Sequence, residues 1–128
     1  MVTFVLIGGA GQTAERPSEV EIMAEQCERM LSEEAPSDSE ALMWSNDQGV
    51  CAGYMAGVVN TMAFYAAIAD RLGNEMPSHL RACYPTRTPL TSFAQAFIEK
   101  ARSEGDLRER GPFMVAIWAF SETWPCPK

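Results

Sequence analysis

Histidine and clustered cysteine are scarce in this chain. His79 is the only histidine, and the four cysteines include no Cys-x-x-Cys pair. Structural zinc needs closely spaced Cys and His ligands, and a nucleophile of the triad type needs a histidine base oriented by an acid. His79 follows Pro77 and Ser78, with no cysteine or acid at such a spacing. We therefore expect no metal site, no cofactor and no enzymatic activity.

Basic residues are also few. Ten Lys and Arg residues stand against 17 Asp and Glu residues, which gives a net charge of −7. Nucleic-acid-binding proteins normally carry the opposite excess, so we expect no nucleic-acid partner. Residues 1–40 hold nine of the acids and two of the bases, which indicates either a solvated helix face or a surface for a basic protein. The candidate partner contacts are Glu21, Glu25, Glu28 and Glu33, together with His79 and Arg81.

Long apolar runs are absent. None approaches the ~20 residues that a membrane helix needs, so we expect no membrane partner. Apolar residues 2–7 lead into a glycine-rich stretch that lacks both common phosphate-binding motifs. An apolar stretch followed by small residues is typical of the end of a signal peptide, although no Lys or Arg precedes this one. We interpret residues 1–14 as a signal-peptide remnant or disordered start, and 15–128 as a single helical domain.

Apolar residues recur at helical spacing through the remaining chain. Ser18 and Glu21 have capping-box spacing at the start of a first helix, and a second capping box indicates a short helix over 37–44. The pattern predicts further helices over 51–72, 88–104 and 113–123. The predicted fold is therefore all-α, a compact bundle of four to five helices.

Two of these predicted helices carry specific packing expectations. Gly49, Gly53 and Gly57 recur every four residues, and glycine costs about 1 kcal/mol relative to alanine inside a helix, so their stripe predicts a closely packed neighbour. The helix over 113–123 is apolar on all sides and is expected to be the buried central helix. The apolar stripe expected to face the core from 51–72 is Cys51, Tyr54, Met55, Val58, Met62, Tyr65, Ala66 and Ala69.

The four cysteines, Cys27, Cys51, Cys83 and Cys126, are widely spaced and even in number. In a small domain this pattern indicates two disulfides and hence an oxidising compartment, such as the periplasm or the extracellular space. The alternative is four buried free thiols in a cytosolic protein.

The cysteine neighbourhoods also carry a family resemblance. Cys27 precedes the block 51–58 (CAGYMAGV), which is followed by Cys83-Tyr84-Pro85 and the terminal Trp124-Pro125-Cys126. Over about residues 20–126 the chain resembles the Rap/Tai family of immunity proteins from type VI secretion systems. A looser likeness to HdeA-type acid-stress chaperones lies in Cys27, Trp44, and Cys83 followed by 91–95 (TSFAQ).

These resemblances imply a function and a disulfide pairing. Rap/Tai proteins are periplasmic, and they bind and block a secreted peptidoglycan-cleaving amidase, often as homodimers. An antiparallel pair of the first two long helices would favour Cys27–Cys51 with Cys83–Cys126. The HdeA likeness favours Cys27–Cys83 with Cys51–Cys126, and we expect this second pairing. The alternative functions are an acid-stress periplasmic chaperone and an exported structural domain.

Overall fold

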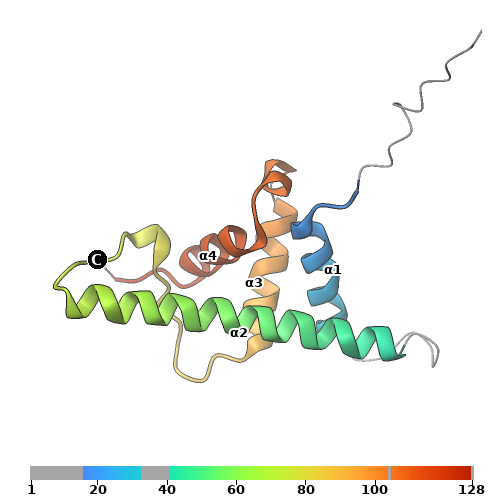
Figure 1. The fold of residues 1–128 in the computed structure, drawn as a ribbon, viewed down its shortest axis with the longest axis horizontal. Helices are drawn as coiled ribbons and strands as arrows, with labels where there is room; N and C mark the ends of the chain where they lie inside the picture. The colour runs from blue at the N-terminus through green and yellow to red at the C-terminus, as the bar shows by residue number, and fades with distance from the viewer. Residues whose placement is uncertain (1–15, 33–40, 104, 128) are drawn as a thin grey trace, which may run out of the picture.

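The computed structural model describes residues 16–32, 41–103 and 105–127. Within these ranges the structure is helical and contains no strand, which confirms the predicted all-α class (Figure 1). Residues 1–14, Glu33 and the capping box expected at 37–40 lie outside the described residues. The helices are α1 (Glu19–Leu31), α2 (Ala41–Arg71), η2 (Ser78–Leu80), α3 (Leu90–Ser103), η3 (Gly105–Glu109) and α4 (Pro112–Thr123).

Helix α1 begins at the predicted capping box. The Ser18 hydroxyl accepts a hydrogen bond from the Glu21 backbone N–H, and the Glu21 carboxylate accepts one from the Ser18 N–H, both at 3.2 Å. These two bonds satisfy backbone donors that the first helical turn leaves unpaired. The helix buries Val20, Met23, Ala24 and Cys27 on one side and leaves its acidic residues on the other.

Helix α2 is a single helix of 31 residues, so the short helix predicted over 37–44 is wrong as a separate element. The close packing predicted from Gly49, Gly53 and Gly57 is also wrong, because a Cβ added at any of them would meet no atom within 4 Å. Their four-residue spacing places them on the side away from the buried Cys51, Met55 and Val58. The predicted stop is confirmed: Gly73 has φ +70°, and the Asn74 N–H donates to the Ala69 carbonyl at 2.8 Å.

The core lies where α1, α3 and α4 pack together against α2 (Figure 1). Its largest fully buried side chains include Phe97 of α3 and Phe120 of α4. Phe93 lies between Phe120 and Trp124, with ring centroids 5.0 and 4.9 Å away. Helix α4 is largely buried, as predicted, but it exposes Phe113 and Met114 at its first turn.

The C-terminal third of α2 extends beyond this core (Figure 1). Met62 is the last buried residue of the helix, and residues 63–68 are all exposed. The prediction that the core-facing stripe continues through Tyr65 and Ala66 is therefore wrong. By length and composition alone, Met43–Arg71 could cross a membrane, but that is weak support for a span because the core helix of a soluble protein passes the same test.

The structure pairs Cys27 with Cys51 and Cys83 with Cys126. The expected pairing of Cys27 with Cys83 and of Cys51 with Cys126 is therefore wrong, and the helix-pair alternative is correct. The physical reason is the packing of α1 on α2, which brings the Cα atoms of Cys27 and Cys51 to 5.1 Å. The second bridge ties the segment before α3 to the residues after α4.

Candidate functional site

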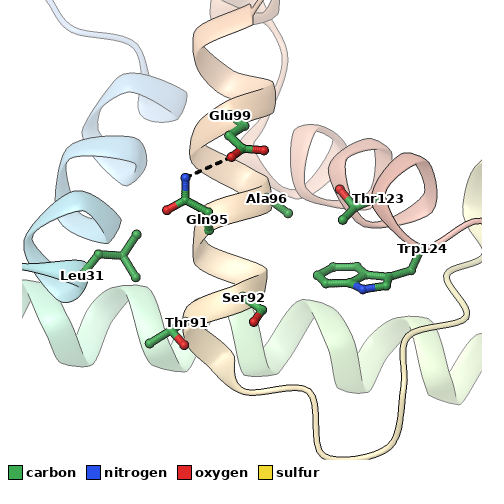
Figure 2. Close-up of a pocket in the computed structure, with 8 residues that line it drawn as sticks. All are labelled: Leu31, Thr91, Ser92, Gln95, Ala96, Glu99, Thr123 and Trp124. Carbon is green, nitrogen blue, oxygen red and sulfur yellow. Dashed lines mark hydrogen bonds between the residues drawn. The ribbon is translucent and has the colours of Figure 1, made fainter.

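A groove lies along the exposed side of α3, between the end of α1 and the end of α4 (Figure 2). It has a volume of about 420 Å³. We call it the α3 groove; its lining residues are Leu31, Thr91, Ser92, Gln95, Ala96, Glu99, Thr123 and Trp124. The residues from α3 follow helical spacing, so one side of a single helix supplies most of the surface.

Trp124 is held firmly at one end of the α3 groove. Its ring packs against Phe93, Phe120 and Tyr84, and its backbone carbonyl accepts a hydrogen bond from the Cys83 N–H at 2.8 Å. The Cys83–Cys126 disulfide lies beside this contact in the chain. The indole is half-buried, so it combines a fixed position with an accessible apolar surface.

A second depression of about 220 Å³ continues the α3 groove between α3 and α4. The two share Ala96, Glu99 and Thr123. Within the groove the Gln95 amide donates to the Glu99 carboxylate at 3.1 Å. The continuation holds an ion pair between Lys100 and Glu122 at 3.0 Å. The combined surface is shallow, and it offers both apolar contact area and hydrogen-bond donors and acceptors.

The acidic residues predicted on the first helix flank this surface. Glu25 is exposed, and Glu28 pairs with Arg102 of α3 at 2.7 Å. Glu21 is committed to the cap of α1. The acidic side of α1 and the α3 groove therefore belong to adjacent, packed helices.

The other predicted contacts lie elsewhere. His79 is exposed in η2, and Arg81 follows it, on the far side of the molecule from α1 (Figure 1). The structure therefore does not bring His79 and Arg81 together with Glu21, Glu25 and Glu28. The Nε of Arg81 is buried and makes no hydrogen bond within the described part of the chain.

Asp47 of α2 fixes α1 against α2. Asp47 is buried and forms an ion pair with Arg29, and the Gln26 amide donates to the same carboxylate at 3.5 Å. Tyr54 lies two turns further along α2, where burial first, and the negative charge of Glu19 second, raise the pKa of its hydroxyl. The contacts of Asp47 with Arg29 and Gln26 hold α1, and with it Leu31 of the α3 groove, in a defined position.

A second groove, which is apolar, lies between α2, η2 and α4 and has a volume of about 300 Å³. We call it the α2–α4 groove; it is lined by Thr61, Met62, Tyr65, Met76, Leu80, Phe113, Met114 and Ile117. The two grooves share no lining residue.

Sequence reasoning missed most residues of both grooves. Gln95 and Trp124 were noted only as parts of family-like motifs, and Glu99 was not singled out. The available signal was the spacing of Thr91, Gln95 and Glu99, which places three polar side chains on one side of a helix. Among the described residues, no group of three or more His, Cys, Asp or Glu side chains is placed to hold a metal ion. The arrangement offers contact surfaces for a macromolecule.

Comparison with known proteins identifies the family. A family model described as Rap1a immunity proteins matches residues 20–126, which is most of the chain. No curated protein and no solved structure gives a match. The matched range contains all four cysteines and every lining residue of both grooves. The chain belongs to the Rap1a immunity protein family.

Proposed function

We propose that this protein is an immunity protein that inhibits a peptidoglycan-cleaving amidase toxin of a type VI secretion system. The observation that carries the proposal is the family match over residues 20–126. Immunity proteins bind a toxin, so the protein needs a recognition surface and no chemistry of its own. The two disulfides accord with an oxidising compartment, and we place the inhibition in the periplasm.

The toxin contacts the α3 groove and the acidic side of α1 in this proposal. Tryptophan is enriched among the residues that dominate binding energy, and Trp124 is already immobilised by its aromatic neighbours. Fixing a side chain before binding lowers the entropy lost on association. Glu25 and Glu99 add negative charge beside the groove, which favours a toxin whose active cleft has a basic rim. The bound protein then occludes that cleft.

Charge reversal tests this surface. We expect Glu25→Lys combined with Glu99→Lys to slow association with the toxin by about tenfold, because rim charges act mainly on association rates. Glu75→Lys is the matched control, since Glu75 is exposed on the connection between α2 and η2. Association would be measured by biolayer interferometry against immobilised amidases at low and high salt. Equal rates for all three proteins, or rates insensitive to salt, would remove this surface from the proposal.

We also propose that the protein acts as a homodimer, as the resemblance to Rap/Tai proteins implies. The charge on the chain limits which surfaces can pair. Four acids and two bases lie in residues 16–32, so two copies of this region would repel each other. A self-association surface is therefore expected away from α1.

A further inference from the structure

Two connecting segments meet at the Trp124 end of the α3 groove. Residues 81–89 link η2 to α3, and residues 124–127 follow α4. The Cys83–Cys126 disulfide joins the two segments, with its Cα atoms 4.9 Å apart. The segment before α3 runs beside Trp124 (Figure 2). Neither segment is helical, so each depends on contacts with other parts of the chain for its position.

Few other contacts join these two segments. Among the described residues, one hydrogen bond does so: the Cys83 N–H donates to the Trp124 carbonyl at 2.8 Å. The Tyr84 ring adds an edge-on contact, with its centroid 6.4 Å from that of Trp124. Both contacts involve residues next to the disulfide in the chain. The Cys83–Cys126 bridge therefore keeps Cys83 and Tyr84 in place against Trp124.

The Cys27–Cys51 disulfide is placed differently. Both of its cysteines are fully buried where α1 packs on α2, and the ion pair of Asp47 with Arg29 joins the same two helices. Neither cysteine of this bridge lines the α3 groove. One bridge therefore lies inside the core, whereas the other lies beside a residue of the candidate binding surface.

The bridge beside Trp124 is also the accessible one. Cys83 is exposed and Cys126 is half-buried. Thiol–disulfide exchange requires that a thiolate reach one of the two sulfur atoms. A dithiol in solution can therefore attack this bridge while the folded core still encloses Cys27 and Cys51.

We propose that the Cys83–Cys126 disulfide positions Trp124 for binding, and that reduction of this bridge by a dithiol converts the α3 groove to a form that binds its partner more weakly. The inference rests on the proposed function only for the partner of the groove. Phe93 and Phe120 still contact the indole after reduction, so Trp124 stays at the groove but is fixed on fewer sides. A less fixed side chain loses more entropy on association, which lowers the affinity.

The reduction is a two-electron exchange. A thiolate of the dithiol attacks the Cys83 sulfur, the S–S bond breaks, and the electron pair leaves on the Cys126 sulfur, which takes up a proton. The second thiol of the dithiol, as its thiolate, then attacks the mixed disulfide and releases Cys83, which is protonated in turn. The dithiol becomes a disulfide and the bridge becomes two thiols. A disulfide oxidant reverses both steps.

NMR of the full-length chain tests the effect on Trp124 without any partner. Dithiothreitol is added at a concentration that peptide mapping shows to reduce Cys83–Cys126 and to leave Cys27–Cys51 intact. We expect hydrogen exchange at the Cys83 amide to become about tenfold faster or more, and the heteronuclear NOE of the Trp124 indole N–H to fall. The indoles of Trp44 on α2 and Trp118 on α4 are the internal controls and should not change. Far-UV circular dichroism should show that the helices are retained.

A binding measurement tests the consequence for the partner. Cys83→Ser combined with Cys126→Ser removes the bridge without a reductant, so any disulfides of the toxin stay intact. We expect this variant to bind an amidase that the wild type inhibits about tenfold more weakly. Val58→Ala is the matched control, because it removes buried core volume and leaves both bridges and both grooves intact. It should bind as the wild type does.

Three results would overturn this inference. They are a Cys83 amide and a Trp124 indole that reduction leaves unchanged, a loss of helical signal when this bridge alone is reduced, and a double-serine variant that binds the amidase as tightly as the wild type. The second result would make the bridge a stabiliser of the whole fold. If the oxidised chain binds no amidase, the proposed function is contradicted, whereas the NMR result still decides whether the bridge positions Trp124.

Discussion

At the scale of single residues, two ion pairs of similar composition differ in their surroundings. The Asp47 side chain is 10% exposed where it pairs with Arg29, whereas Glu28 and Arg102 are each nearly half exposed. Ion pairs in water contribute little, because solvent screens them and the side chains lose entropy. A carboxylate enclosed by protein depends more on its partner, because water no longer solvates it.

The difference in burial predicts that the two ion pairs contribute unequally to the free energy of unfolding. Asp47→Asn is expected to lower the free energy of unfolding by about 1–2 kcal/mol, since it removes a charge-assisted hydrogen bond between α1 and α2. Glu28→Gln is the control and is expected to cost about 0.5 kcal/mol or less. Urea unfolding followed by tryptophan fluorescence measures both. Equal losses for the two variants would contradict the assignment of Asp47 as the residue that anchors α1.

Tyr54 predicts a pH dependence. Burial and the Glu19 carboxylate raise the pKa of its hydroxyl above the usual value of 10.0, so the folded state favours the neutral phenol. The resulting stabilisation is fully present below pH 10.0 and is lost as pH rises through the higher folded-state pKa. The Tyr54→Phe variant should therefore lose less thermal stability than the wild type as the pH rises above about 10. Melting temperatures across that range test this, with Tyr65→Phe as the control for removing one tyrosine.

At the scale of elements, local sequence predicted where helices begin and end. It did not predict which neighbours the helices pack against. The Ser18 capping box and the Gly73 stop were predicted correctly because both act within one helical turn. The apolar stripe of α2 was misjudged beyond Met62 because helical spacing reports an apolar side without saying what covers it. The disulfide pairing was wrong for a related reason: it depends on how α1 and α2 pack.

The two disulfides predict an order of reduction. Cys27 and Cys51 are fully buried, whereas Cys83 is exposed and Cys126 is half-buried. We expect dithiothreitol to reduce Cys83–Cys126 first under native conditions, because thiol exchange requires access to a sulfur atom. Alkylation of the released thiols and peptide mapping over time would report the order. Simultaneous reduction of both bridges would show that the whole domain opens before either sulfur is attacked.

At the scale of the whole molecule, the fold class was predictable and the binding surfaces were not. Composition, helix caps and apolar spacing were enough to predict the all-α fold, which the structure shows within the described ranges. The α3 groove combines Leu31, residues 91–99 and residues 123–124, which only the packed structure brings together. The acidic side of α1 was the one part of this surface that the sequence indicated, because its charge is local to one helix. His79 and Arg81 were predicted as contacts on a separate loop, and that loop lies away from α1, so their role in binding stays a prediction.

We propose above that this chain neutralises an amidase toxin by binding it. The most direct measurement is peptidoglycan hydrolysis by each of a panel of type VI secreted amidases, titrated with the oxidised full-length protein. Binding without chemistry predicts complete inhibition of one amidase at a ratio of one to one, with the inhibitor recovered intact. Undiminished hydrolysis by every amidase in the panel at a large excess of the protein would contradict the claim.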